Sequence, residues 1–327
     1  MKATAMAHPN IALIKYWGKR HHALNLPATG SYSLTLAPIS TKTTVTWQQE
    51  RDTLWLNGTE THGRPLERIE KFLDLLRKDH PHLGHAKVES ANDFPTAAGL
   101  ASSASAFAAL ALAATAAAEI LRDDRALSIL ARRGSGSAAR SIFGGFVRMN
   151  PGIQEDGSDA FAEQRYDENH WDLRVLFALT AEGEKDVSST VGMNQTVQTS
   201  PYFDAWCHAV PTALDAMDHA IGTKDFEQVA ELAEASALQM HASAIAAVPG
   251  VLYWKPATVA LIHAVRKLRA DGFPVFFTID AGPHVKVFVE ADYATQVARA
   301  LRNIDGVLDV FETAGGGAAQ ILHEATP

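Results

Sequence analysis

Residues 93–105 read DFPTAAGLASSAS and lead into an alanine-rich segment that continues to residue 121. Because alanine is the best helix former, this pattern predicts a helix that begins after a loop of small residues. Such a loop exposes backbone N–H groups beside the positive end of the helix dipole, and Ser102 and Ser103 add hydroxyl groups. The segment favours an anion-binding pocket, although close packing of a buried helix explains its small residues equally well.

This loop differs from the two common nucleotide-binding motifs, since it contains neither G-x-x-x-x-G-K-S/T nor G-x-G-x-x-G. A second segment of small residues, 131–141, reads ARRGSGSAARS. Its backbone N–H groups can surround an oxyanion, and the planar guanidinium of Arg140 can bind a carboxylate or phosphate through two N–H groups. A flexible linker is the alternative, but the arginine content and the patterned flanks favour an anion-binding role.

The composition is that of a globular protein with two domains. The chain has 327 residues, 47% of them hydrophobic, and a formal net charge of -8 at pH 7. This length exceeds that of a usual single core. The negative charge argues against a nucleic-acid partner, and the N-terminus and the alanine-rich segment lack the character of a signal peptide or membrane span. A single cysteine, Cys207, excludes a disulfide framework, so we expect a cytoplasmic protein.

Local patterns predict both strands and helices in each half of the chain. Strands are expected at residues 31–36, 41–47 and 173–179, a hairpin at residues 275–289, and helices at residues 65–78, 209–221, 225–240 and 256–271. The polar and acidic segment 154–169 separates the two halves. We therefore expect an α+β fold with an N-terminal domain at residues 1–169 and a C-terminal domain at residues 170–327.

Two further segments carry candidate catalytic groups. Residues 10–20 read NIALIKYWGKR, which places Lys15, Lys19 and Arg20 near two aromatic side chains. These cations can bind an anionic ligand, although a solvated surface is the commoner reason for such a group. Asp280 ends an apolar strand before a Gly-Pro turn, where rigid backbone can hold a general base or a substrate-orienting group. A local Asx turn is the alternative role for Asp280.

Taken together, five segments resemble the mevalonate diphosphate decarboxylases of the GHMP small-molecule kinase superfamily. They are residues 10–19, 94–103, 133–138, 186–193 and 280–283, in the order that the family shows. The phosphate loop alone would indicate the superfamily, whereas the KYWGK and DAGP sequences are specific to its decarboxylase branch. The resemblance implies a two-domain GHMP kinase fold, with a ribosomal protein S5 domain 2-like N-terminal domain and an α/β-sandwich C-terminal domain. The active site would lie in the cleft between them.

The resemblance also implies an activity, which is the ATP-dependent decarboxylation of mevalonate 5-diphosphate to isopentenyl diphosphate. ADP, phosphate and CO2 would be released, as in the mevalonate pathway of isoprenoid biosynthesis. ATP and Mg²⁺ are the implied cofactors, and members of the family are often homodimers. By the family pattern, Asp280 would orient or deprotonate the 3-hydroxyl group, Arg140 would hold the carboxylate, and Lys15 would lie beside the reacting groups.

The other site residues that the resemblance implies bind the substrate or the nucleotide. Substrate contacts are expected from Asn10, Tyr16, Trp17, Gly18, Lys19, Ser135, Gly136, Ser137, Ala138, Ala139, Arg140 and Ser189. Nucleotide contacts are expected from Arg68, Pro95, Ala97, Ala98, Gly99, Leu100, Ala101, Ser102, Ser103 and Thr190. Tyr16 and Lys19 would bind the substrate diphosphate, and either Ser102 or Ser103 would face the magnesium ion.

Two places depart from the family pattern. Thr29 and Gly30 stand where the family commonly has asparagine followed by serine or asparagine, and His284 stands where it has asparagine. Both places lie near expected substrate contacts, so related activities stay open: an enzyme of mevalonate 5-phosphate or mevalonate 3,5-bisphosphate, or a mevalonate 3-kinase. A non-catalytic ligand-binding regulator is more remote, because both small-residue loops, Lys15 and Asp280 are present.

Overall fold

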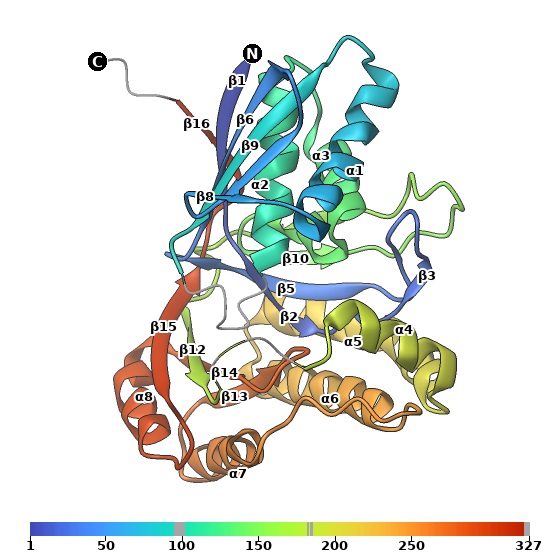
Figure 1. The fold of residues 1–327 in the computed structure, drawn as a ribbon. Coiled ribbons are helices and arrows are strands. Elements are labelled where there is room, and N and C mark those ends of the chain that lie inside the picture. Colours follow the sequence, from blue (N-terminus) through green and yellow to red (C-terminus); the bar gives the residue numbers. More distant parts are fainter. Residues whose placement is uncertain (95–101, 182, 184–185, 324–327) are drawn as a thin grey trace.

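The computed structural model describes residues 1–94, 102–181, 183 and 186–323. In these residues two main sheets are flanked by helices, and a small two-stranded sheet lies to one side (Figure 1). The strands are β1 (Lys2–Ala7), β2 (Asn10–Ile14), β3 (Lys19–His21), β4 (Leu26–Pro27), β5 (Ser31–Ala37), β6 (Thr41–Gln49), β7 (Thr53–Leu56), β8 (Thr59–Thr61), β9 (His85–Asn92), β10 (Phe146–Met149), β11 (Ala162–Tyr166), β12 (Leu173–Leu179), β13 (Val275–Ile279), β14 (Val285–Glu290), β15 (Asp309–Gly315) and β16 (Gln320–Leu322). The helices are α1 (Arg64–Asp79), α2 (Ser102–Ala117), α3 (Asp124–Gly134), α4 (Ser189–Thr199), α5 (Phe203–Thr223), α6 (Phe226–Ile245), α7 (Pro256–Ala270) and α8 (Ala294–Arg302), with 3-10 turns η2 (Gly136–Ile142) and η3 (Ala291–Tyr293).

The first sheet has the strand order β16-β1-β6-β9-β7-β8 in the described residues, and helix α2 packs along β1 and β6. Helices α1 and α3 lie on the same side of this sheet as α2 (Figure 1). Helix α2 is apolar on all sides because it is buried from all sides, which is the expected composition of a core helix. The Trp47 indole on β6 donates a hydrogen bond to the Ala114 carbonyl of α2 at 3.0 Å. The close-packing explanation of the alanines is therefore confirmed, whatever the helix N-terminus also binds.

The second sheet has the order β11-β10-β5-β15-β12-β14-β13 in the part of the chain that the structure describes, with β2 paired to β5. Its C-terminal strands alternate in the side-chain direction, as strands buried on both faces do. Val275 and Phe277 of β13 face the core formed with α7 and α8, whereas Phe276 faces the core formed with α5 and α6. Helices cover both faces of these strands, so the end of β13 lies inside the molecule.

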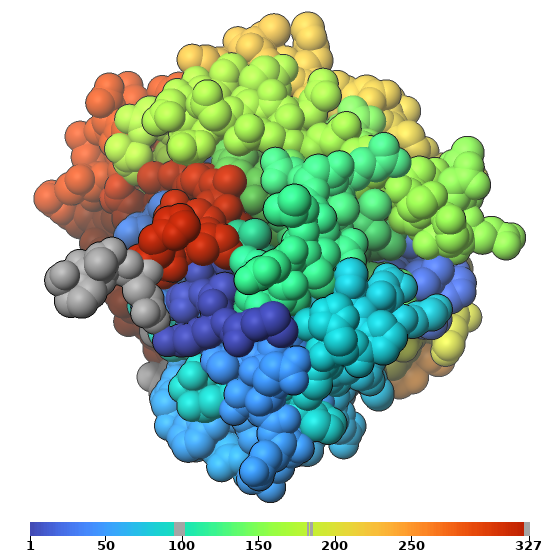
Figure 2. All heavy atoms as spheres, turned by 90° about the horizontal axis from the view of Figure 1, so that it is seen from above, coloured from blue at the N-terminus to red at the C-terminus, as the bar shows by residue number. Residues whose placement is uncertain are grey.

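Backbone pairing joins the two halves of the chain. Strand β5 from the first half pairs with β15 from the second, with Ala37 opposite Ala314 and Leu36 opposite Gly315. Gly316 then donates to the Thr35 carbonyl and accepts from Gly145, both at 2.8 Å. Beyond this joint the chain returns to the first sheet, where β16 pairs with β1. Figure 2 shows the blue N-terminal strand beside the red C-terminal segment. The boundary at residues 169 and 170 remains a prediction.

The antiparallel hairpin of β13 and β14 and helices α1 and α7 are confirmed within one residue at their ends. Helices α5 and α6 are also confirmed, but α5 begins at Phe203 rather than at residue 209, and α6 ends at Ile245 rather than at residue 240. The linker alternative for residues 131–141 is wrong, because they form the last turn of α3 and most of the 3-10 turn η2. These residues are largely buried and form regular backbone hydrogen bonds, whereas a flexible linker would be exposed and irregular. Among the described residues, no helix has both the length and the apolar composition needed to span a membrane.

The glycine joint between β5 and β15 gives a stability prediction. A Cβ on Gly316 would lie 2.8 Å from the Leu36 carbonyl carbon and 2.9 Å from the Ala37 nitrogen, where backbone must move to admit it. We expect Gly316→Ala to destabilise the protein by about 1–3 kcal/mol, the usual cost of overpacking. Gly317→Ala is the matched control, since its Cβ would meet only Glu168 Oε1 at 3.7 Å. Thermal melts of both variants would contradict the prediction if they coincide.

Candidate active site

A cavity of about 1000 Å³ opens where segments from both halves of the chain meet. Its described lining combines the segment after β2, one side of α1, the N-termini of α2 and α4, the junction of α3 and η2, and the segment after β13. The lining residues are Asn10, Ala12, Lys15, Tyr16, Trp17, Lys19, Asn25, Arg64, Pro65, Glu67, Arg68, Lys71, Ser102, Ser103, Gly134, Ser135, Gly136, Ser137, Arg140, Ser188, Ser189, Thr190, Met193, Met240, Asp280 and Ala281. The cavity therefore occupies the cleft that the sequence predicts.

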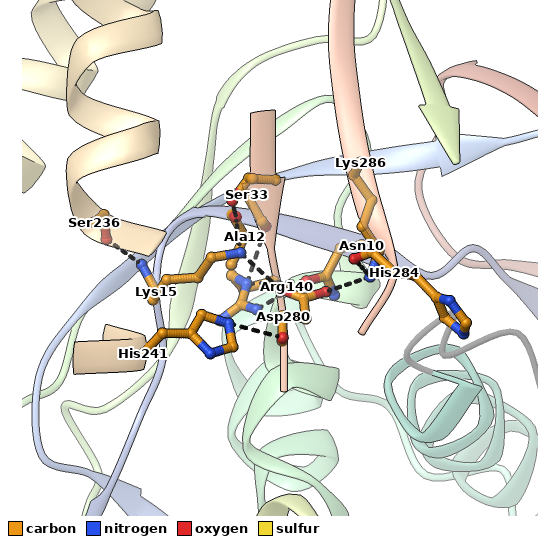
Figure 3. Close-up of polar contacts among 11 residues, drawn as sticks. Asn10, Ala12, Lys15, Ser33, Arg140, Ser236, His241, Asp280, His284 and Lys286 are labelled. Atoms are coloured by element: carbon orange, nitrogen blue, oxygen red, sulfur yellow. Dashed lines mark hydrogen bonds and ion pairs between the residues drawn. The ribbon is translucent and has the colours of Figure 1, made fainter. Parts of the chain in front are cut away.

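The centre of the site is an ion pair between Lys15 and Asp280 (Figure 3). Lys15 Nζ donates to Asp280 Oδ1 at 2.7 Å and to the Ala12 carbonyl at 2.8 Å. The Lys15 backbone N–H donates to Ser236 Oγ on α6 at 3.0 Å, which fixes the start of the side chain. The lysine is 2% exposed and the aspartate 28%, so the carboxylate is the partner that faces the cavity.

The surroundings of this pair shift the pKa values of both of its groups. Burial lowers the pKa of Lys15 from 10.5 to about 8, and attraction to Asp280 offsets part of that effect. Burial acts to raise the pKa of Asp280, but the positive charges of Lys15 and Lys286 outweigh it and lower the pKa to about 2. At neutral pH the carboxylate is ionised and weakly basic, while Lys15 titrates within a range where activity can be measured.

Arg140 on η2 provides a buried positive charge beside the pair. Its Nε and Nη2 donate to Asn10 Oδ1 at 3.1 and 2.9 Å, Nη1 donates to Ser31 Oγ at 2.6 Å, and Nε donates to Ser33 Oγ at 3.0 Å. These acceptors are neutral, so they orient the guanidinium without cancelling its charge. Burial lowers the pKa of Arg140 only to about 10, and the group stays charged. Such a site suits an incoming carboxylate or phosphate.

Two groups that support Asp280 escaped the sequence analysis. Lys286 Nζ on β14 lies 3.8 Å from Asp280 Oδ2, and His241 Nε2 on α6 donates to the Asp280 carbonyl at 3.1 Å. Burial lowers the pKa of His241 to about 4, so its imidazole is neutral at pH 7. The signal for Lys286 was a lone charge inside the apolar run of β14, Val285–Glu290. His241 stands in an alanine-rich helix and gave no comparable signal.

Hydroxyl groups gather where two helices begin at the cavity. Ser103 Oγ in the first turn of α2 lies 3.4 Å from Ser135 Oγ, which in turn lies 3.4 Å from Ser137 Oγ. Ser188 caps α4 by accepting a hydrogen bond from the Val191 backbone N–H at 3.3 Å. Both helix N-termini thus meet the cavity with polar groups, an arrangement that suits phosphate oxygens.

The structure brings together most of the predicted site residues. Those that line the cavity are Asn10, Lys15, Tyr16, Trp17, Lys19, Arg68, Ser102, Ser103, Ser135, Gly136, Ser137, Arg140, Ser189, Thr190 and Asp280. Among the described residues Gly18, Ala138 and Ala139 are not part of the lining. Ala138 and Ala139 are fully buried. A Cβ on Gly18 would lie 2.5 Å from the Phe203 ring, so that ring covers the glycine. Pro95, Ala97, Ala98, Gly99, Leu100 and Ala101 lie outside the described residues.

The two departures from the family pattern also lie outside the described lining. His284 accepts a hydrogen bond from the Thr180 backbone N–H at its Nδ1, at 3.1 Å, and its ring points away from the group around Asp280 (Figure 3). A Cβ on Gly30 would lie 2.6 Å from Leu214 Cδ1 and 2.8 Å from the Met149 carbonyl. The glycine therefore admits the close approach of α5 and β10. Gly30 thus serves the packing near the site, and His284 serves a hydrogen bond to the segment after β12.

Comparisons with known proteins agree with this geometry. A family model described as diphosphomevalonate decarboxylase-like N-terminal domain matches residues 7–162, and one described as mevalonate 5-diphosphate decarboxylase C-terminal domain matches residues 175–317. The diphosphomevalonate decarboxylase of Candida albicans is 38% identical over 88% of this chain and 84% of its own. The chain belongs to the diphosphomevalonate decarboxylase family. The resemblance drawn from its motifs is thereby confirmed.

Solved structures of the diphosphomevalonate decarboxylase family extend the likeness to the whole fold. The mevalonate diphosphate decarboxylase of Staphylococcus aureus is 37% identical, with a TM-score of 0.92 over 98% of both chains. A structure described as MDDEF in complex with MVAPP, AMPPCP and magnesium is 42% identical, with a TM-score of 0.92 over 99% of both chains. The predicted two-domain α+β fold is therefore correct.

The depressed pKa of Lys15 gives a prediction for the free enzyme. We expect kcat/KM to fall as the pH rises through about 8, because deprotonation of Lys15 removes a positive charge that a phosphorylated substrate needs. Lys15→Arg keeps the charge over this range, so its residual activity should lack the alkaline limb. A pH profile of kcat/KM for both proteins decides the matter. An activity that rises through pH 8 would instead identify Lys15 as a base.

Proposed function

We propose that this chain catalyses the ATP-dependent decarboxylation of mevalonate 5-diphosphate to isopentenyl diphosphate, with release of ADP, phosphate and CO2. This is a step of the mevalonate pathway of isoprenoid biosynthesis. The observation that carries the proposal is the Lys15–Asp280 pair facing the same cavity as Arg140. A reaction that couples phosphoryl transfer to loss of a carboxylate needs both kinds of group. Membership of the decarboxylase family supports the same activity.

The substrate's two anionic ends would occupy different parts of the cavity. Arg140, oriented by Asn10 and the two serines of β5, is suited to hold the carboxylate. Tyr16 and Lys19 also line the cavity and are suited to bind the diphosphate. Lys19 Nζ donates to Asn25 Oδ1 at 2.6 Å, so its ammonium is already placed at the cavity wall. Holding both ends fixes the position of the 3-hydroxyl group between them.

Asp280 would act on that hydroxyl as a hydrogen-bond acceptor. Its low pKa makes it a weak base, which suits a loose phosphoryl-transfer transition state where the proton leaves late. The hydroxyl oxygen attacks the γ-phosphorus of ATP, the bond to the ADP oxygen breaks, and the proton passes by way of Asp280 to solvent, which leaves the carboxylate ionised for the second step. Lys15 is hydrogen-bonded to Asp280 and so would lie beside the reacting hydroxyl. There its positive charge would neutralise negative charge that develops on the transferred phosphoryl group.

The second step would release CO2. The bond between C3 and the phosphorylated oxygen breaks with its electron pair on the phosphate, which leaves an electron-deficient carbon. The electron pair of the bond to the carboxylate carbon then forms the new double bond, and CO2 departs. The negative charge of Asp280 stabilises the electron-deficient centre, which explains why a carboxylate held ionised is useful here.

ATP and magnesium fit the nucleotide side of the cavity. Backbone and hydroxyl groups at the start of α2, with Arg68 on α1, are suited to phosphate oxygens. Within the described ranges no three His, Cys, Asp or Glu side chains form a metal site. Magnesium in phosphoryl-transfer sites is bound largely by substrate phosphates and water, so a hydroxyl of Ser102 or Ser103 suffices. When bound, the ion neutralises charge on the phosphates.

The remaining parts of the proposal concern the protein's context. The partner at the site is a small molecule, and the net charge of -8 disfavours nucleic acid. We infer a cytoplasmic homodimer from the family pattern and from the single cysteine. Size-exclusion chromatography with light scattering tests the dimer.

The activity is tested with ATP, magnesium and, in separate reactions, mevalonate, its 5-phosphate, its 5-diphosphate and its 3,5-bisphosphate. We expect ADP and CO2 in equal amounts with the 5-diphosphate only. Equal release with mevalonate or its 5-phosphate would identify a related decarboxylase, and CO2 without ADP from the 3,5-bisphosphate would identify an enzyme that acts on the already phosphorylated 3-position. ADP without CO2 would identify a kinase. Release of neither product with any substrate would support a ligand-binding regulator.

Asp280→Asn gives a sharper test of the mechanism. The amide has nearly the same shape but carries no charge, so it can neither accept the proton nor stabilise the electron-deficient carbon. We expect kcat to fall by about 10³-fold and the melting temperature to fall as well, because Lys15 and Lys286 lose their buried partner, although the variant still folds. Asp271→Asn, directly after α7, removes a surface ion pair with Lys267 and is the control. Turnover of Asp280→Asn above a tenth of the parent rate would remove Asp280 from the mechanism.

A further inference from the structure

Lys286 is a buried charge whose position in the sheet suits a hydrophobic side chain. It lies in the middle of β14, opposite Thr278 of β13 and Phe177 of β12. Its neighbours Val285 and Val287 point into the core with α7 and α8, whereas Lys286 points to the other face of the sheet and is 1% exposed. Its Nζ lies over the Phe177 ring at 5.8 Å. Burial of an ammonium group is costly, so the group needs a compensating partner.

Asp280 is that partner. Lys286 Nζ lies 3.8 Å from Asp280 Oδ2 and donates to the His284 carbonyl at 3.4 Å. Among the described residues, Lys286 does not line the cavity, so it reaches the reaction only through Asp280. The two oxygens of the carboxylate thus face different ammonium groups, Oδ1 that of Lys15 and Oδ2 that of Lys286 (Figure 3).

We propose that Lys286 is a positioning residue: its buried ammonium holds the Oδ2 side of Asp280, and so fixes the carboxylate in the orientation and charge state in which it meets the substrate hydroxyl. The inference rests on the proposed function, because it concerns the group that acts in that reaction. It also separates the roles of the two lysines. Lys15 lines the cavity and is placed to meet a transferred phosphoryl group there, whereas Lys286 lies outside the described lining and acts only through Asp280.

The charged groups around Asp280 support this division. Lys15 approaches from the end of β2, Lys286 from β14 and Arg140 from η2, while neutral His241 on α6 holds the Asp280 carbonyl. Burial acts to raise the pKa of Asp280, and these positive charges, Lys15 first and Lys286 second, lower it to about 2. Loss of one buried opposite charge within a few ångströms raises the pKa of a carboxyl group by about 1–3 pH units.

The test replaces Lys286 with methionine, which keeps the length of the side chain and removes the charge. Carboxyl ¹³C NMR of aspartate-labelled protein follows the titration of Asp280, whose signal is assigned by its absence from Asp280→Asn. We expect the titration midpoint to rise by about 1–3 pH units. We also expect kcat to fall by about 10–100-fold, with KM changed less than about threefold, because Lys286 supports a group that acts in the transition state.

Thr278→Val is the matched control. Thr278 lies directly across from Lys286 on the same face and donates to the Ala12 carbonyl at 3.2 Å, so its replacement disturbs the packing there without removing a charge. Its Asp280 titration should match that of the parent protein. An unchanged Asp280 titration in Lys286→Met would overturn the proposal, as would a loss of activity that arises from KM alone.

A second variant separates an effect on folding from an effect on function. Lys286→Gln also removes the charge but keeps hydrogen-bonding groups, so it replaces the methionine variant if that variant melts early. Failure of both variants to fold would assign Lys286 a structural role and overturn the proposal. The NMR titration needs no substrate. If the parent protein releases no CO2 from the 5-diphosphate, the proposed function fails while the titration still decides whether Lys286 holds Asp280.

Discussion

The buried ion pair between Lys15 and Asp280 is the interaction on which the site depends. It joins a segment after β2 to the end of β13, which are 265 residues apart in the sequence. Removing either partner would leave an unpaired charge in a poorly solvated place, which is far costlier than the loss of a surface ion pair. The pair therefore connects the two halves of the chain and also places at the cavity the carboxylate that the proposed mechanism uses.

The surrounding fold keeps this pair in place. Strand β2 pairs with β5, β5 pairs with β15, and β15 pairs with β12, so a continuous series of backbone hydrogen bonds runs from Lys15 towards β13. Helix α6 packs against both β2 and β13 and contributes Ser236 and His241 to the two sides of the pair. Lys15, Asp280 and Arg140 lie at strand ends and on a 3-10 turn, which hold geometry more firmly than long loops do.

The charge balance of the site explains its chemistry. Arg140, Lys15 and Lys286 place three buried cations around one carboxylate, an excess that is unfavourable in the empty protein and favourable once anionic ligands arrive. The neutral partners of Arg140 leave that excess undiminished. Binding of an anionic substrate therefore reduces the electrostatic repulsion among these three cations.

The sequence alone determined the elements, the family and the central residues, because these depend on local properties. Periodicity placed the strands and helices, and the KYWGK and DAGP segments identified Lys15 and Asp280. Only the tertiary structure determined which side chains are in contact. Lys286 and His241 support Asp280, His284 turns towards Thr180, and Ala138 and Ala139 are buried away from the lining. These facts follow from the pairing of strands and the packing of helices far apart along the chain, and neither is encoded in the spacing of neighbouring residues.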